Sequence, residues 1–381
     1  MMSRGTIAKI NLDALRHNFS IIHSKLPLHP VIAMIKANAY GHGSLEVAEA
    51  LPNANAFGVA TLNEALALRA AGIQQDIVLM AGFQNEIELR ICHDQNLTSV
   101  IHSFHQLELL ETVIDHGLLK IWLKIDTGMH RLGFFPEEIS EVYQRLVESS
   151  AVMIPIGLMT HLATADWLHS AMTQQQLEIF GEVVSRYEGP KSVANSAIIM
   201  GEPNLVRPRE WLRPGIMLYG VSPFAGTTGR EYGLRPVMSL EARIMLIKNL
   251  HCGDKIGYGG TWQCPEDMSI GVVSIGYGDG YPRSVKNGTP VLVNGVRCAV
   301  VGRVSMDMIT IDLRSCPEAA AGDTVVLWGE DLPIEEIAVN ADGFSYEILS
   351  GITPRVERQY VSDQAESYSD VFLIKEGTYD E

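Results

Sequence analysis

The chain of 381 residues is long enough for two domains, and its 46% hydrophobic and 19% charged residues are typical of a globular protein. Its net charge of −16 argues against nucleic acid or an anionic membrane as the main partner. No apolar run reaches the roughly 20 residues of a membrane helix, and the N-terminus lacks the apolar stretch of a signal peptide. We therefore expect no membrane association.

Strands and helices alternate through the first part of the chain. A short strand is predicted over residues 7–10 and a helix over residues 11–26. Eight apolar strand segments follow, at residues 31–35, 56–60, 76–80, 98–101, 120–125, 155–160, 191–194 and 212–219. Thr61 and Glu64 form a capping-box pattern at the start of one intervening helix. Eight successive βα units predict an α/β fold, a (β/α)8 TIM-type barrel over residues 6–235. A doubly wound open sheet is the alternative, but no GxGxxG sequence follows the first strand.

The pattern changes after residue 235. Short β-rich runs, separated by Gly, Pro and Asn, lie at residues 240–250, 269–275, 290–293, 297–301, 308–313 and 324–328. Asn294 and Gly295 are a hairpin signal between two of them. We expect a second, mainly antiparallel β domain over residues 236–361 and an acidic tail over residues 362–381.

The cysteines are odd in number and scattered, at Cys92, Cys252, Cys264, Cys298 and Cys316, and they form no CxxC pair. This pattern favours reduced thiols in a cytoplasm over a disulfide framework. We expect no metal site.

The stretch VIAMIKANAYGHG at residues 31–43 places Lys36 at the end of a buried strand. In a barrel, this end of the strand lies at the rim where active sites are found. A desolvated lysine has a lowered pKa, and its free amine can condense with an aldehyde. The alternative is a lysine whose stem packs while its head reaches water.

Two loops at the same rim could bind phosphate, because barrels often place phosphate sites after strands 7 and 8. Ser196 can donate a hydroxyl hydrogen bond, and Gly215 allows backbone N–H groups to approach a phosphate oxygen. Asn-Ser and Pro-Gly also mark ordinary turns. Together with Lys36, these loops suggest pyridoxal phosphate, an aldehyde cofactor that carries a phosphate.

Further polar groups follow other strands. Lys124 and Arg131 stand in KIDTGMHRLG, and His161 follows the sixth barrel strand. An arginine can hold a substrate carboxylate by a two-pronged hydrogen bond, although Arg131 could be a solvated surface charge and His161 a satisfied strand-end histidine. In the second domain, Tyr277 lies in the glycine-rich IGYGDGY, which suits either close backbone approach or an ordinary turn.

At this point the chain resembles the alanine racemase family, bacterial pyridoxal-phosphate enzymes with a barrel and a β domain. The resemblance runs from about residue 6 to about residue 360. Its motifs are VIAMIKANAYGHG, KIDTGMHRLG, MTHLATAD, ANSA, RPGIMLYG, IGYGDGYPR, VGRVSMDM and SYEILSGITPRVERQY.

The resemblance implies a role for each matching residue. Lys36 would be the Schiff-base lysine, and Tyr277 would be a second catalytic residue that enters from the other subunit of a homodimer. The implied contacts to pyridoxal 5'-phosphate are Tyr40, Ser196, Gly215, Ile216 and Tyr346 at the phosphate, Arg213 at the pyridine nitrogen, and His161 between Arg213 and Tyr277.

Three more positions match the substrate side of the family's site. Arg131 and Met306 match contacts to the substrate carboxylate, and Lys124 matches a lysine that is carbamylated in many members. His130 stands where many members carry glycine.

The implied reaction interconverts L-alanine and D-alanine by two bases on opposite faces of the substrate, and it would supply D-alanine for peptidoglycan. Lys36 would serve the D-antipode and Tyr277 the L-antipode. Three alternatives stay open: a racemase of another small amino acid such as serine, a pyridoxal-phosphate decarboxylase of the same two-domain plan, and a barrel protein that carries the cofactor.

Overall fold

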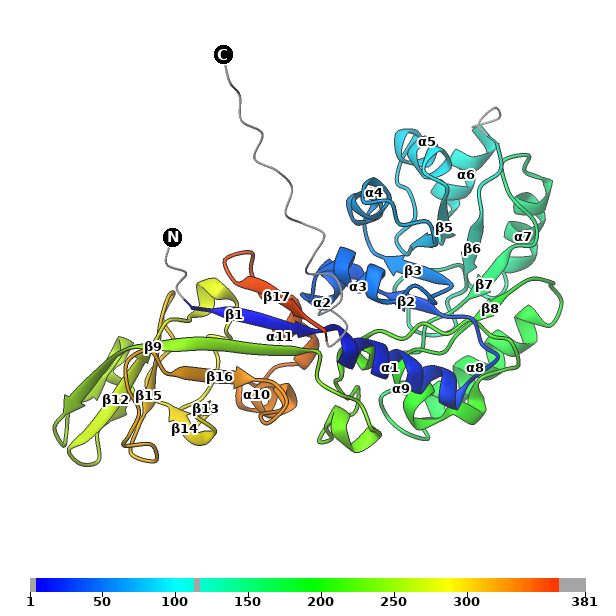
Figure 1. Ribbon diagram of the computed structural model, residues 1–381. Coiled ribbons are helices and arrows are strands. Elements are labelled where there is room, and N and C mark those ends of the chain that lie inside the picture. The colour runs from blue at the N-terminus through cyan, green and yellow to red at the C-terminus, as the bar shows by residue number, and fades with distance from the viewer. Residues whose placement is uncertain (1–4, 113–116, 363–381) are drawn as a thin grey trace, which may run out of the picture.

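The computed structural model describes residues 5–112 and 117–362, so most of the acidic tail predicted over residues 362–381 lies outside the described residues. Two domains lie side by side in Figure 1, an α/β domain and a β domain. The parallel sheet of the first runs in chain order through β2 (Ile32–Met34), β3 (Ala56–Val59), β4 (Asp76–Leu79), β5 (Leu97–Ile101), β6 (Ile121–Lys124), β7 (Gly157–Met159) and β8 (Lys191–Ser192).

Helices that precede, connect and follow these strands cover the outside of the sheet (Figure 1). They are α1 (Leu12–Lys25), α3 (Ser44–Ala50), α4 (Leu62–Ala70), α5 (Glu86–Asp94), α6 (Phe104–Thr112), α7 (Ile139–Glu148), α8 (Ala171–Val184) and α9 (Ser196–Gly201). The capping box predicted for α4 is confirmed: Glu64 N donates to Thr61 Oγ1 at 3.3 Å, and Thr61 N donates to Glu64 Oε2 at 3.1 Å. In the described part of the chain, no helix is long and apolar enough to cross a bilayer.

The barrel closes through a very short eighth segment. Leu212 forms a parallel bridge with Val31, and Arg213 forms one with Asn195. The strand predicted over residues 212–219 is wrong beyond this point, because Pro214 has no N–H to extend the ladder and η2 (Ile216–Tyr219) is a 3-10 helix. The prediction of a (β/α)8 barrel is nevertheless confirmed.

Side chains at alternate positions along the strands fill the inside of the barrel. Ile32 and Met34 pack inside it with Trp122, whereas Ala33 and Ile35 belong to the larger core that includes the helices. Side chains on a strand point to opposite faces in turn, so a strand buried on both faces reads as a continuous apolar run.

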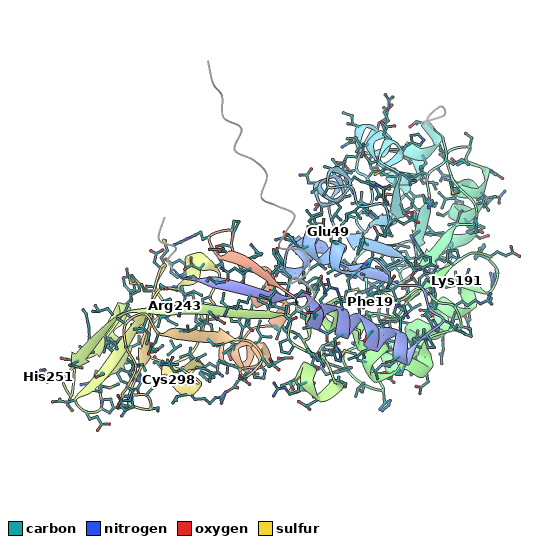
Figure 2. All side chains as sticks on the ribbon, viewed as in Figure 1. Phe19, Glu49, Lys191, Arg243, His251 and Cys298 are labelled. Atoms are coloured by element: carbon teal, nitrogen blue, oxygen red, sulfur yellow. The ribbon has the colours of Figure 1, made fainter. Side chains whose placement is uncertain are left out.

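The second domain is built on β9 (Met238–Leu250), β12 (Met268–Val273), β13 (Pro290–Val293), β14 (Val296–Val300), β15 (Ile309–Asp312) and β16 (Thr324–Trp328). Each pairs antiparallel with the next in the order β12-β15-β14-β13-β16-β9, and β9 pairs again with β12. The six strands therefore form a closed ring, whose far end is marked by His251 in Figure 2. The hairpin predicted at Asn294 and Gly295 joins β13 to β14 and is confirmed.

The first and last strands of the chain extend this ring. The strand β1 (Ile7–Asn11) pairs antiparallel with β9 and parallel with β17 (Glu357–Val361). The predicted boundary at residue 6 placed β1 in the barrel, whereas its hydrogen bonds place it in the sheet of the second domain. The helices α10 (Ile334–Asn340) and α11 (Ser345–Ser350) precede β17 and complete this domain.

Candidate active site

Lys36 follows β2 and begins α2 (Lys36–Tyr40), a single turn with left-handed backbone angles. Ala37, Asn38 and Ala39 have φ of 52° to 53°, and Tyr40 has φ of 53°. Such angles cost L-residues about 1–2 kcal/mol each. Ala39 N donates to Ile35 O at 2.8 Å, and Gly41 N donates to Ala37 O at 3.0 Å. This turn presents Lys36 and Tyr40 at the C-terminal rim of the barrel.

The Lys36 amine is largely desolvated. Burial lowers its pKa, the positive charges of Arg131 and Arg213 lower it further, and the carboxylate of Glu64 opposes them. Glu64 is fixed beside the turn, since its Oε1 accepts a hydrogen bond of 2.6 Å from Ala37 N. A lowered pKa increases the fraction of free amine, which is the nucleophilic form.

Lys124 shares this surplus of positive charge. It is buried, and its pKa falls to about 8 because of burial first and then the charges of Arg213, Arg131 and Lys36. Among the residues that the structure describes, only the Asp126 carboxylate opposes this decrease. Four cationic side chains therefore act on one another at the rim of the barrel, and this arrangement favours an anionic ligand.

Arg213 is buried and held by carbonyl oxygens. Its Nη2 donates to Thr160 O at 2.5 Å and to Val193 O at 3.2 Å, and lies 3.5 Å from Nδ1 of His161. Burial lowers the pKa of Arg213 to about 10, while Glu210 opposes the decrease. The pKa of His161 lies well below its usual range because of burial and then the charge of Arg213, so this imidazole is neutral.

A cradle of hydroxyl and amide groups lies beside the turn. Ser196 Oγ accepts hydrogen bonds from Gly215 N at 2.8 Å and from Met217 N at 3.4 Å. The Tyr40 hydroxyl would lie only 2.6 Å from a Cβ placed on Gly215, and burial raises the pKa of Tyr40 to about 12. Ile216 begins η2 at the same loop.

A second tyrosine approaches this cradle from the second domain. The ring of Tyr346, on α11, lies 6.2 Å from the ring of Tyr40. Burial raises the pKa of Tyr346, so its phenol is a hydrogen-bond donor at neutral pH. The structure thus brings together the five residues for which the family resemblance implied a phosphate contact.

Arg131 follows a tight loop that Asp126 organises. The Asp126 carboxylate accepts hydrogen bonds of 3.0 Å from Gly128 N and from His130 N. Burial raises the pKa of Asp126, but these hydrogen bonds and the nearby His130 imidazole outweigh that effect and hold it below its ordinary value. The loop leaves Arg131 exposed, with its charge acting on Lys36 and Lys124.

Tyr277 and Met306 lie together in the second domain. Tyr277 begins η5 (Tyr277–Asp279); its N–H donates to Ser305 O at 3.0 Å, and Gly278 N donates to Met306 O at 2.9 Å. Both side chains are partly exposed, by 39% for Tyr277 and 52% for Met306. Within one chain, these contacts join Tyr277 to Met306 and not to the cluster around Lys36.

Two acidic residues of the site were missed by the sequence analysis. Glu64 was seen only as a capping residue, although it also bonds to Ala37 N. Glu210 bonds to Val193 N at 2.7 Å and to Ala194 N at 3.1 Å, and its charge acts on Arg213. The only sequence signal for Glu64 is that its helix begins directly after a barrel strand.

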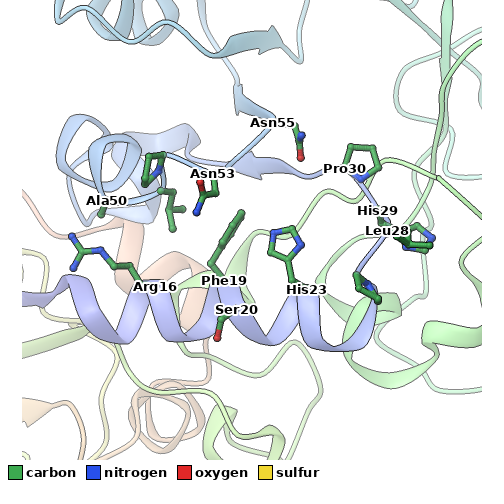
Figure 3. A pocket seen from close by; sticks show the side chains of 13 residues that line it. Arg16, Phe19, Ser20, His23, Leu28, His29, Pro30, Ala50, Asn53 and Asn55 are labelled. Atoms are coloured by element: carbon green, nitrogen blue, oxygen red, sulfur yellow. The ribbon is translucent and has the colours of Figure 1, made fainter.

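A separate cavity of about 740 Å³ lies at the other end of the barrel, between α1 and the segments that precede β2 and β3 (Figure 3). Phe19 and His23 line it from α1, and Pro30 and Asn55 line it from those segments. Lys36 follows the opposite end of β2, so this cavity is not part of the candidate active site.

The fold and the rim define a class of protein: a (β/α)8 barrel enzyme with a partner β domain, a reactive lysine and a cationic, hydroxyl-lined site for an anionic ligand. Two family models match the chain, "Alanine racemase, N-terminal domain" over residues 10–223 and "Alanine racemase, C-terminal domain" over residues 237–360. The chain belongs to the alanine racemase family, whose members are isomerases that use pyridoxal phosphate.

Individual relatives agree with this assignment. An alanine racemase of Coxiella burnetii is 52% identical over 361 residues, which cover 93% of this chain and 98% of that protein. The biosynthetic alanine racemase of Escherichia coli is 45% identical over 353 residues, covering 92% and 98%. The crystal structure of biosynthetic alanine racemase from Pseudomonas aeruginosa superposes with a TM-score of 0.90 at 40% identity, covering 95% and 100%. The Bartonella henselae enzyme, solved with covalently bound pyridoxal phosphate, has a TM-score of 0.84 at 27% identity, covering 94% and 99%.

Proposed function

We propose that the chain interconverts L-alanine and D-alanine with pyridoxal phosphate at the rim of the barrel. The observation that carries this proposal is the Lys36 amine, whose pKa is lowered by burial and by two arginines beside a hydroxyl-lined loop. The E. coli relative bears the name biosynthetic, so we further propose that the product is D-alanine for peptidoglycan. All five cysteines are free thiols, which supports a cytoplasmic location.

The residues present fit the cofactor. Its phosphate requires hydrogen-bond donors, which Tyr40, Ser196, Tyr346 and the amide of Ile216 would provide. The Gly215 amide donates to Ser196 Oγ in this structure and would be shared between that oxygen and the phosphate. Among the described residues, three carboxylates, Glu64, Asp126 and Glu210, oppose the four neighbouring cations. A phosphate and a substrate carboxylate would supply further negative charge. When bound, pyridoxal phosphate supplies a conjugated ring that accepts the electron pair left at Cα after proton removal.

Lys36 would remove or return the α-proton on one face of the substrate. An amine must be unprotonated to act as a base, and burial and the neighbouring arginines favour that form. The Glu64 carboxylate opposes the lowering of the Lys36 pKa. In this proposal it would therefore stabilise the ammonium that Lys36 becomes when it takes up the α-proton.

Tyr277 would act on the opposite face, as Tyr277 of the partner subunit in a homodimer. Its partly exposed ring beside the exposed Met306 supports this arrangement, because such side chains are available to a second copy of the chain. The guanidinium of Arg283 lies 6.0 Å from the centre of the Tyr277 ring, a cation–π contact that would help to orient the ring.

Arg213 would face the pyridine nitrogen. An arginine retains its proton at neutral pH, so it would leave the ring nitrogen unprotonated. The carbonyls of Thr160 and Val193 orient the guanidinium. The neutral His161 beside it would lie between Arg213 and Tyr277 of the partner subunit.

Arg131 would bind the substrate carboxylate together with Met306 of the partner subunit. Lys124, with a pKa of about 8, is unprotonated in about a tenth of the molecules at pH 7, and the free amine is the form that reacts with carbon dioxide. Carbamylation of Lys124 would place a negative charge among the cations and orient Arg131.

Circular dichroism of purified enzyme with L-alanine or L-serine tests the reaction. We expect the L-alanine signal to decay to zero, and Lys36→Ala to abolish both the decay and the absorbance band of the lysine-bound cofactor. Decay with L-serine but not with L-alanine would favour the serine racemase alternative. Carbon dioxide release would favour the decarboxylase.

Mixing two inactive variants tests the shared site. Lys36→Ala and Tyr277→Phe chains, unfolded and refolded together, would form heterodimers in which one of the two sites has both bases. With random pairing, we expect about a quarter of wild-type activity. Refolding each variant with itself is the control, and an equally inactive mixture would show that Tyr277 does not act across the dimer.

A further inference from the structure

Arg358 reaches from the second domain to the turn that carries Lys36. It lies on β17 and is half-buried. Its Nε donates to Gly41 O at 2.7 Å, directly after the turn, and its Nη2 donates to Ile352 O at 3.2 Å, in the segment after α11. One guanidinium therefore ties the barrel turn to the second domain.

The turn requires support from outside because its backbone is strained. Four consecutive residues without a glycine, Ala37 to Tyr40, have positive φ, a conformation that L-residues adopt rarely. The bonds from Ala39 N to Ile35 O and from Gly41 N to Ala37 O span four residues, and a right-handed turn would form the same bonds. The internal hydrogen bonds therefore do not select the left-handed form, whereas contacts with neighbouring elements do.

His42, two residues after the turn, also contacts the backbone of the turn. It is fully buried, and its Nδ1 lies 3.0 Å from Ala39 O and 2.9 Å from Tyr40 O. Both partners are acceptors, so the ring donates from Nδ1. Burial lowers the pKa of His42 to about 4, and the charge of Arg358 is among the effects that keep it low, so the ring stays neutral. His42 also stacks on Tyr219 at 4.5 Å between ring centres.

The helix α11 packs against Gly41, the residue that follows the turn. A Cβ on Gly41 would lie 2.1 Å from Leu349 O, so the backbone of α11 touches the turn directly. The same helix carries Tyr346, whose ring lies 6.2 Å from that of Tyr40. Arg358, through Ile352, thus fixes the turn and the end of α11 relative to each other.

We infer that Arg358 is a positioning residue for the active site: by holding Gly41 O, it keeps the left-handed turn in place and so orients the Lys36 amine and the Tyr40 hydroxyl toward the cofactor. This inference rests on the proposed function. Arg358 acts through Gly41, since the hydrogen bonds described for its side chain go to Gly41 O and Ile352 O and to no group that the proposed reaction changes.

The test compares three full-length variants purified as holoenzymes. Arg358→Met keeps the length of the stem and removes both donors, and Arg358→Lys keeps the charge but cannot span Gly41 O and Ile352 O. Gln359→Met is the matched control, because Gln359 is exposed on the same strand and, within the described part of the chain, its Nε2 donates only to Glu357 Oε1, at 2.9 Å. Hydrogen exchange is measured by mass spectrometry on peptides covering residues 36–43 and residues 357–361. Release of pyridoxal phosphate is followed after dilution.

We expect Arg358→Met to exchange at least tenfold faster over residues 36–43 and to release the cofactor at least tenfold faster, with Arg358→Lys between it and the wild type. Gln359→Met should match the wild type. Wild-type exchange over residues 36–43 would overturn the inference, and so would faster exchange without faster cofactor release. If Arg358→Met does not fold, Arg358→Lys decides by the same criteria. A wild-type chain that racemised no alanine would refute the proposed function, while the exchange data would still report on the turn.

Discussion

The buried amine of Lys124 makes stability depend on pH in a direction that can be worked out. Its pKa falls from 10.5 to about 8, chiefly because of burial. A tenfold change in proton affinity is worth about 1.4 kcal/mol, so retaining this proton costs the folded chain about 3 kcal/mol at pH 7. Between pH 8 and pH 10.5 the unfolded chain binds more protons at this position, so the free energy of unfolding rises with pH across that window.

Replacing Lys124 with Met removes this penalty and its pH dependence. The difference in free energy of unfolding between Lys124→Met and the wild type should therefore shift by about 2.5 kcal/mol in favour of the wild type when the pH is raised from 7 to 10. Equilibrium urea denaturation of the cofactor-free chain, in buffer free of carbonate, measures the difference at each pH. Groups away from Lys124 contribute equally to both proteins and cancel, whereas Lys36, whose charge interacts with that of Lys124, does not cancel completely.

Lys120→Met is the control for this experiment. Lys120 lies just before the same strand and forms a partly exposed ion pair of 2.9 Å with Asp76, a kind of interaction worth about 0–1 kcal/mol. We expect its stability difference from the wild type to change little with pH. A difference between Lys124→Met and the wild type that stayed within about 0.5 kcal/mol from pH 7 to pH 10 would refute the reasoning.

Two glycines give sharper steric tests. Gly215→Ala would place a Cβ 2.6 Å from the Tyr40 hydroxyl and displace that hydroxyl. Losing one hydrogen bond to a charged group costs about 1.5–3 kcal/mol, so titration should show that pyridoxal phosphate binds roughly 10- to 150-fold more weakly. The control is Gly343→Ala, whose added Cβ would make only ordinary contacts and which should bind the cofactor normally. Gly157→Ala would place a Cβ 2.5 Å from the Trp122 ring inside the barrel and should destabilise the chain by about 1–3 kcal/mol in urea denaturation; an unchanged midpoint would contradict the close contact.

Local patterns were sufficient to predict most elements. Apolar runs bounded by turn residues predicted the barrel strands, Thr61 and Glu64 predicted the start of α4, and Asn294 with Gly295 predicted the β13–β14 hairpin. Each of these signals acts over a few residues, so no knowledge of distant partners was required. The position of Lys36 at a strand end was predictable for the same reason.

The left-handed turn was not predictable from its own residues. Its sequence, KANAY, contains no glycine, and alanine favours a right-handed helix. The conformation depends on contacts from elsewhere in the chain, among them Glu64 from α4 and Arg358 from β17. Tertiary contacts override local preference here, at the point where the candidate active site requires an unusual geometry.

The pairing of β1 was unpredictable for a different reason. An apolar strand over residues 7–10 has the same local appearance whether it enters a barrel or extends a second sheet. Its partners, β9 and β17, lie more than two hundred residues away, and no local feature identifies them. The role proposed for Tyr277 depends on an even more distant partner, a second chain, and stays a prediction.

The pairing of Ile7 with Glu357 also has a consequence for synthesis. The first strand leaves the ribosome 350 residues before its parallel partner, which at about 5–20 residues per second is a delay of roughly 20–70 s. During that interval β1 presents an open edge, which is a site for aggregation. The barrel can form while the chain is still growing, but the second domain is complete only after β17 emerges, so a stalled or truncated chain would have a finished barrel and an unprotected first strand.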